Sequence, residues 1–149
     1  MDCRRFIEAR VKEMKKTVGD GKVISALSGG VDSSVCTVLA HRALGKKLEV
    51  IFIDDGLMRQ YEPESVKRSF ARLGIKVDIL NAQKDFFRAL KGITDPEEKR
   101  KAFRDCFYRT LGKAVKASKA HFLLQGTIAA DIIETKKGVK TQHNILEQI

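Results

Sequence analysis

Few cysteines and no long hydrophobic run occur in this sequence, and each shortage excludes a class of protein. The three cysteines, Cys3, Cys36 and Cys106, are odd in number and widely spaced, which argues against a disulfide framework and against a zinc site. No run of about 18 apolar residues is present, so we expect no membrane span. The residues that follow Met1 lack an apolar segment that could serve as a secretory signal. We therefore expect a protein of the reducing cytoplasm.

Negative charge is scarce compared with positive charge. The sequence has 29 lysine and arginine residues against 19 aspartate and glutamate residues, a formal net charge of +10. The excess is densest between Lys84 and Lys119, where eleven basic residues stand against five acidic ones. Because this stretch lacks the interleaved aromatic residues typical of RNA-binding surfaces, we expect no nucleic-acid partner and interpret it as the solvated face of a helix. A surface that attracts nucleotide phosphates or an acidic partner subunit is the alternative.

Apolar periodicity predicts alternating strands and helices in one domain over residues 1–149. Short apolar runs predict buried strands at 23–27, 48–53, 76–80 and 121–124. Helical spacing covers 3–18, the segment from the turn at 28–30 to Gly45, the segment from Glu62 to Gly74, a brief stretch at 86–90, and a long stretch from Pro96 onward. Because strands and helices alternate with short connections, we predict an α/β fold: a doubly wound parallel sheet with helices on both faces.

Two of the expected helices have recognisable inner faces. The helix after the first strand should turn one apolar face inward, with Cys36 as a small core residue; that face comprises Val31, Val35, Val38, Leu39 and Ala43. The long helix should begin with Asp95 as its cap, Pro96 at its first position and Glu98 completing a capping box. Its inner face is expected to hold Phe103, Cys106, Phe107, Thr110, Leu111, Ala114 and Val115.

One loop has the composition of a phosphate site, although the commoner phosphate motifs are absent. Neither G-x-x-x-x-G-K-[ST] nor G-x-G-x-x-G occurs. Residues 28–34 instead read SGGVDSS between the first strand and its helix. Glycines let backbone N–H groups approach an anion, and the helix N-terminus adds its dipole. The serine hydroxyls can donate further hydrogen bonds, and Asp32 is a hard oxygen ligand suited to Mg²⁺. An ordinary Ser/Gly turn with Asp32 as a helix cap is the alternative.

Two more polar loops follow strands of the predicted sheet. Residues 54–56 (Asp-Asp-Gly) follow the second strand, and residues 125–127 (Gln-Gly-Thr) follow the fourth. Because ligands of such sheets bind beyond the carboxyl ends of the strands, we expect both loops to gather with residues 28–34 at one edge. Taken alone, the first could be a plain turn and the second a strand end with a cap.

The SGGVDSS segment is the signature of the PP-loop ATP pyrophosphatases, which this sequence resembles. Four further segments make the chain similar to the ATP pyrophosphatase domain of the GMP synthetases. They read IFIDDGLMR at 51–59, DPEEKRKAF at 95–103, LLQGTIAADIIET at 123–135 and KTQHNI at 140–145. Together with LSGGVDSSV at 27–35, they run in that family's order over nearly the whole chain. The resemblance implies an N-type PP-loop domain with an adenine nucleotide alpha hydrolase-like fold.

The resemblance also implies a reaction with ATP and Mg²⁺ as cofactors. ATP would activate the C2 carbonyl of xanthosine monophosphate by adenylylation, with release of pyrophosphate, and ammonia would then displace AMP to give GMP. No glutaminase domain precedes the loop, so glutamine-derived ammonia would come from a separate glutamine amidotransferase subunit. The family's C-terminal dimerisation domain is likewise absent after Ile149, and a homodimer is left open.

Site residues are carried over by motif position. Ser28, Gly29, Gly30, Val31, Asp32, Ser33 and Ser34 would hold pyrophosphate, with Asp32 also on Mg²⁺. The backbone around Ile53 would read adenine, and Gly126 and Thr127 would contact the sugar or the phosphates. Lys140 would reach the phosphates from a lid that includes His143. Asp131 and Glu134 are candidate metal ligands, with a helix cap or a surface pair as the alternative.

The chain departs from the family's usual pattern at four positions. Asp55 replaces an asparagine, Arg104 a glycine, Ala130 a proline and Gln142 a histidine. These changes leave ATP handling intact and bear on the acceptor substrate. Two other functions therefore stay open: a PP-loop ligase that acts on a different acceptor, and an ATP-binding module that is inactive alone.

Overall fold

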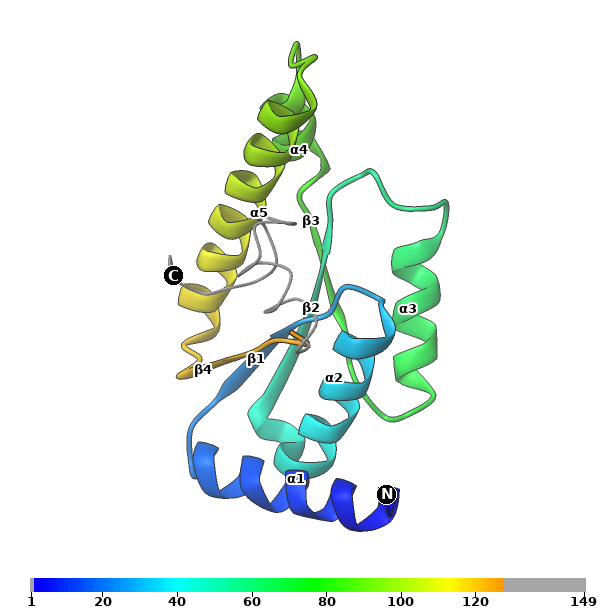
Figure 1. Cartoon of the computed structure of the whole chain (residues 1–149), viewed down its shortest axis with the longest axis vertical. Coiled ribbons are helices and arrows are strands. Elements are labelled where there is room, and N and C mark those ends of the chain that lie inside the picture. Colours follow the sequence, from blue (N-terminus) through cyan, green and yellow to red (C-terminus); the bar gives the residue numbers. More distant parts are fainter. Residues whose placement is uncertain (1, 128–149) are drawn as a thin grey trace.

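Four parallel strands form a single sheet in the computed structural model, which describes residues 2–127 (Figure 1). The strand order is β3-β2-β1-β4, and every neighbouring pair is parallel. The chain thus moves from β1 to one side of the sheet and later returns to the other side, which puts a topological switch point between β1 and β4. The strands are β1 (Val23–Ala26), β2 (Leu48–Asp54), β3 (Asp78–Asn81) and β4 (Phe122–Leu124).

Five α-helices flank or connect these strands within the described residues. In Figure 1, α2 and α3 lie on one side of the sheet, α4 and α5 on the other, and α1 crosses one end. The predicted doubly wound sheet with helices on both faces is therefore confirmed. The helices are α1 (Cys3–Val18), α2 (Val31–Leu44), α3 (Glu62–Ala71), α4 (Gln83–Leu90) and α5 (Pro96–Ser118), with a 3₁₀ turn at Gly45–Lys47.

The alternation of side chains along β2 divides the core into two layers. Ile51 and Ile53 pack with residues of α4 and α5, including Phe86 and Leu111. Val50 and Phe52 pack on the opposite side against α3 and the segment after it. Both faces of β2 are apolar because both are covered, as expected for a parallel sheet.

The start of α5 follows the predicted capping pattern in one of its two hydrogen bonds. The Asp95 carboxylate accepts the Glu98 N–H at 2.9 Å, and Pro96 occupies the first turn. The reciprocal bond from the Asp95 N–H to the Glu98 carboxylate does not occur between these described residues. The predicted inner face is confirmed, because Cys106 and Leu111 are fully buried and Phe103, Phe107, Ala114 and Val115 pack around them.

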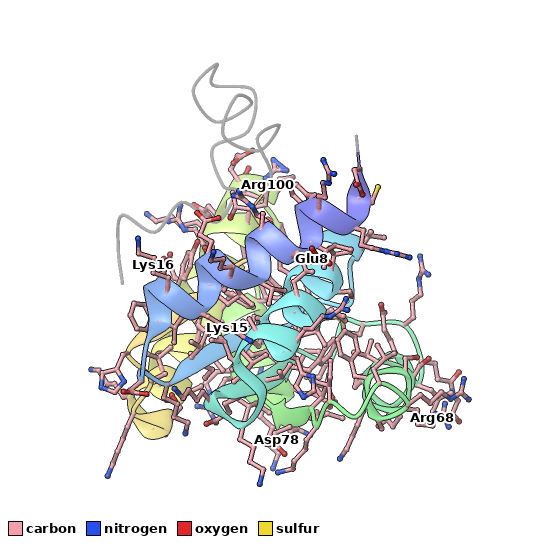
Figure 2. All side chains as sticks on the ribbon, turned by 90° about the horizontal axis from the view of Figure 1, so that it is seen from below. Glu8, Lys15, Lys16, Arg68, Asp78 and Arg100 are labelled. Carbon is pink, nitrogen blue, oxygen red and sulfur yellow. The ribbon has the colours of Figure 1, made fainter. Side chains whose placement is uncertain are left out.

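The predicted inner face of α2 is wrong at its first turn. Val31 and Val35 are 79% and 52% exposed, whereas Thr37 and Ala40 are the buried residues of this helix. Val35 instead lines an apolar groove of about 540 Å³ between α1, α2 and α3. Helix α1, which crosses over α2 in Figure 2, has no buried residue of its own. The first turn of α2 therefore projects beyond the sheet, where none of the described helices covers it.

A buried hydrogen bond joins β1 to α2 directly behind the loop between them. The Ser25 and Thr37 hydroxyls lie 2.9 Å apart, and both residues are buried. A hydroxyl that is buried without a partner costs free energy, whereas a matched pair of apolar replacements does not. This pair therefore ties the strand and the helix on either side of residues 27–30.

No helix within residues 2–127 combines the length and the hydropathy needed to cross a membrane. Residues 128–149, which include Lys140, lie outside the described part, so the single domain expected over 1–149 stays a prediction.

Replacement of Thr37 by valine should lower the free energy of unfolding by about 1–3 kcal/mol, because Ser25 then loses its buried partner. The double variant Ser25→Ala/Thr37→Val should recover much of that loss, since neither hydroxyl is left unpaired. Urea denaturation of the two variants and the parent measures both values. Equal loss in the single and the double variant would show that the hydrogen bond is not the cause.

Candidate nucleotide site

The loop between β1 and α2 is organised by hydrogen bonds among its own hydroxyls. The Ser28 and Ser33 hydroxyls lie 2.8 Å apart, and the Gly30 N–H donates to Ser28 Oγ at 3.3 Å. The hydroxyls of Ser33 and Ser34 both donate to the Gly30 carbonyl, at 3.1 and 2.7 Å. These contacts hold the loop in one shape before any ligand arrives.

The first turn of α2 has the backbone features of an anion site. Its N-cap is Gly30, which has no side chain, and no other side chain in the described chain caps the helix. The N–H groups of this turn are consequently left to a ligand, at the positive end of the helix dipole. The surrounding residues 28–32 are exposed. The alternative of an ordinary turn with Asp32 as cap is not observed, because Gly30 takes that position.

The loop after β4 lies directly against this turn. A Cβ atom added to Gly126 would sit 2.7 Å from the Ser33 nitrogen, 2.8 Å from Ser33 Cα and 3.0 Å from the Asp32 carbonyl carbon. Only a glycine permits so close an approach between two backbones. The structure thus brings residues 125–127 and residues 28–34 to the same edge of the sheet, as the sequence predicts.

The turn after β2 also lies at this edge, but its acidic residues serve the turn itself. The Asp54 carboxylate accepts the Gly56 N–H at 3.0 Å, and the Asp55 carboxylate accepts the Leu57 N–H at 2.8 Å. Asp55 is only 6% exposed. The negative charge at the position where the family usually has asparagine is therefore turned toward the backbone of its own turn.

Ile53 combines a buried side chain with a backbone that, among the described strands, has no ladder partner on one side. Its side chain is part of the core, so it can meet a ligand only through its peptide groups. The β1–β2 register ends at Ala26 and Ile51, whereas the β2–β3 register continues to Asp54 and Asn81. On its β1 side, Ile53 therefore extends beyond the last residue pair of the β1–β2 ladder.

A cavity of about 520 Å³ connects these loops with α5, and its lining includes residues that sequence reasoning did not assign to the site. Ser28 and Leu57 contribute from the two loops, and the other walls come from helices. The basic stretch at 84–119 was interpreted as a solvated face, yet three of its cations open onto this cavity beside aromatic rings. The helical lining consists of Leu90, Lys99, Arg100, Phe103, Arg104, Phe107 and Tyr108.

A sequence signal for this cavity exists in the spacing along α5. Lys99, Phe103 and Phe107 follow one another at intervals of four, and Arg100, Arg104 and Tyr108 do the same. Residues four apart share a helix face, so aromatic and basic side chains form two adjacent rows. Such a surface can hold a flat ring and attract phosphate.

The thiol closest in sequence to the loop is not primed for nucleophilic chemistry. Burial raises the pKa of the Cys36 thiol, and the negative charge of Asp32 raises it further. A thiol needs a depressed pKa to react as the thiolate. Cys36 therefore stays protonated at neutral pH, consistent with its predicted role as a small packing residue.

Asp32 is the carboxylate of the loop that can reach a metal ion. It is exposed in the first turn of α2, and no cluster of three metal-ligating side chains occurs among the described residues. Mg²⁺ commonly uses one or two carboxylates together with substrate phosphates and water, so a single aspartate beside a phosphate loop fits it. Asp131, Glu134, Lys140 and His143 lie outside the described residues.

A parallel sheet with an uncapped, serine-lined loop between β1 and α2 defines an α/β nucleotide-binding domain. Comparison with known families agrees, because the PP-loop domain family matches residues 4–137. The chain belongs to the PP-loop domain family.

Curated relatives are similar over almost all of this chain. It is 51% identical to a subunit of the glutamine-hydrolyzing GMP synthase of Archaeoglobus fulgidus over 97% of this chain, and 50% identical to the subunit of the same name from Thermococcus kodakarensis over 94%. These alignments cover 47% and 46% of the relatives. The chain thus spans about half the length of the curated relatives it matches.

A solved structure shares the fold. The NH3-dependent NAD synthetase from Campylobacter jejuni in complex with the nitrate ion superposes with a TM-score of 0.68. The superposition covers 82% of this chain and 56% of that chain, at 19% sequence identity. The likeness shows a common architecture.

Replacement of Gly126 by alanine should weaken ATP binding about tenfold or more, because the new Cβ would force the loop after β4 away from Ser33. Isothermal titration calorimetry with ATP and Mg²⁺ measures the change. Gly112→Ala is the matched control, since a Cβ at Gly112 in α5 meets nothing within 4 Å. Unchanged binding in the Gly126 variant would show that the contact with Ser33 does not shape the site.

Proposed function

We propose that this chain is the ATP-using part of an enzyme that aminates xanthosine monophosphate to GMP. In this reaction ATP adenylylates the C2 carbonyl oxygen with release of pyrophosphate, and ammonia then displaces AMP. The observation that carries the proposal is the loop at 28–34, whose hydroxyls and free N–H groups suit a pyrophosphate. The curated relatives, which are named as subunits of glutamine-hydrolyzing GMP synthases, support the choice of acceptor.

The loop suits a reaction that cuts ATP between its α- and β-phosphates. Charge develops on the departing pyrophosphate, and preorganised donors can stabilise it without reorganising during the reaction. The N–H groups of the first α2 turn supply such donors, and Ser28 and Ser33 are already held in place by their mutual hydrogen bond. Gly126 and Thr127 would border the phosphates or the sugar from the loop after β4.

The proposed ATP site includes Mg²⁺ near Asp32, where the ion would neutralise charge on the phosphates. The peptide groups of Ile53 would read the edge of the adenine ring. The cavity beside Phe103 and Phe107 has room for the base, and the cations of α5 would attract the nucleotide as a whole. Lys140 stays a predicted lid residue.

Ammonia and partners belong to the same proposal. The relatives are named as one subunit of a glutamine-hydrolyzing enzyme, so we propose that a separate glutamine amidotransferase subunit supplies ammonia. A cytoplasmic location suits these nucleotide substrates. The homodimer left open by the resemblance stays a prediction, as does the absence of a nucleic-acid partner.

Incubation with ATP, Mg²⁺, xanthosine monophosphate and ammonium should yield AMP, pyrophosphate and GMP in equal amounts. Chromatography of the nucleotides and a coupled pyrophosphate assay measure the three products. Omission of the acceptor is the control. The appearance of ADP and phosphate in place of AMP and pyrophosphate would contradict the proposed function.

Replacement of Asp32 by alanine should abolish Mg²⁺-dependent pyrophosphate release, because the loop then lacks its carboxylate. The fold should persist, since the loss of an acidic residue from a first helical turn costs only about 0.3–1 kcal/mol. Asp20→Ala is a suitable control, as Asp20 is an exposed residue that pairs with Lys47 away from the loop. Near-normal turnover in the Asp32 variant would contradict the metal assignment.

A second candidate is an ATP-binding module that is inactive alone, favoured by the fact that the chain spans about half of its relatives' length. Calorimetry would then show ATP binding, whereas no acceptor and no added subunit would give pyrophosphate release. A PP-loop ligase with another acceptor is tested by a screen for compounds that stimulate pyrophosphate release. A sulfur-transfer reaction through Cys36 is disfavoured by the raised pKa of its thiol.

A further inference from the structure

The turn after β2 is fastened to helix α4 through a single aspartate. Asp54 is the last residue of β2, and its carboxylate has two partners: Oδ1 accepts the Gly56 N–H at 3.0 Å, and Oδ2 accepts Gln83 Nε2 at 2.8 Å. Its backbone carbonyl accepts the Ala82 N–H at 2.9 Å. Three hydrogen bonds thus converge on one residue, and two of them come from the start of α4.

The fit between the turn and α4 is tight. A Cβ atom at Gly56, whose φ is +78°, would lie 2.7 Å from Phe87 Cζ and 3.0 Å from Gln83 Cγ. The turn therefore rests on the first two turns of α4 and cannot move toward them. Gln83 is the member of this contact that also forms a directional bond, because its side-chain amide reaches Asp54 across 29 residues of sequence.

The segment held in this way carries the parts of the site that face the nucleotide base. Ile53 lies immediately before Asp54, and its peptide groups are those proposed to read adenine. Leu57 lies three residues after it and forms part of the cavity wall. The phosphate loop is not part of this contact, because its hydrogen bonds run among Ser28, Gly30, Ser33 and Ser34.

We propose that Gln83 is a positioning residue for the adenine end of the nucleotide site. Through Asp54 it holds the turn after β2 on α4, and so sets where the Ile53 peptide groups and the Leu57 wall meet the base. The inference rests on the proposed function, since it assumes that ATP is the ligand. Gln83 touches no ligand itself, and the phosphate end of the site is organised independently of it.

The donor at position 83 is required because its partner is an acceptor. Asp54 in its ionised form offers only acceptors, so an amide NH₂ at 2.8 Å is matched to it. A glutamate at position 83 would bring a second carboxylate to that distance. Because the Asp54 carboxylate also holds the Gly56 N–H, such repulsion would disturb the turn as well as the contact.

The variant Gln83→Leu should weaken ATP binding about tenfold, since a hydrogen bond to a charged group is lost. Binding of inorganic pyrophosphate with Mg²⁺ should change less than twofold, because the phosphate loop does not depend on Gln83. The preference for ATP over GTP should fall by a similar factor to the ATP affinity. Calorimetry with the three probes measures these changes, and Lys84→Ala, an exposed change on the same helix, is the control.

A donor–acceptor exchange tests the same contact with a conservative pair of changes. Gln83→Glu alone should weaken ATP binding at least as much as Gln83→Leu. The double variant Asp54→Asn/Gln83→Glu should restore it, because the amide introduced at position 54 then donates to the carboxylate introduced at position 83. The oxygen of that amide still accepts the Gly56 N–H. Circular dichroism and urea denaturation of each variant verify that the fold is kept.

The outcomes separate this inference from the proposed function. If the unaltered chain binds pyrophosphate but not ATP, the proposed function fails. If the unaltered chain binds ATP and Gln83→Leu binds it equally well, Gln83 has no positioning role. Parallel losses for ATP and pyrophosphate would show a general structural role and overturn the inference, as would a double variant no better than Gln83→Glu.

Discussion

The uncapped first turn of α2 is the constraint on which the site depends. A helix N-terminus leaves backbone donors without partners, and most helices satisfy some of them with a serine, threonine, aspartate or asparagine at the cap. Here Gly30 occupies that position, and the serines before and after it bond to one another and to the Gly30 carbonyl instead. The donors are thereby kept for an anion, and the loop is rigid before binding.

The sheet places this turn where other loops can reach it. Because the chain leaves β1 toward β2 and later returns to the opposite side with β4, the loops after β1 and β4 lie together at the switch point. The contact of Gly126 with Ser33 is the closest of these approaches. A buried bond between Ser25 and Thr37 holds β1 and α2 together behind the loop. The site is thus assembled from backbone positions more than from reactive side chains.

Sequence patterns predicted most of the architecture, and the errors have a common origin. The strands and helices occur within a few residues of their expected bounds, because apolar periodicity and glycine stops act locally. Val35 was wrongly assigned to the core, since periodicity identifies an apolar face without saying what covers it. Arg100 and Arg104 were interpreted as solvated for the same reason: their helix spacing was visible, but the cavity beside them was not.

The sequence by itself determined the class of fold, the position of the phosphate loop and the order of the motifs, because each depends on residues close together in the chain. Only the tertiary structure decided that Gly126 contacts Ser33, that Asp55 turns into its own backbone, and that Gln83 bonds to Asp54. These are relations between distant segments, set by how helices pack on the sheet. Local pattern carries no information on that packing, so the shape of the base end of the site had to come from the fold.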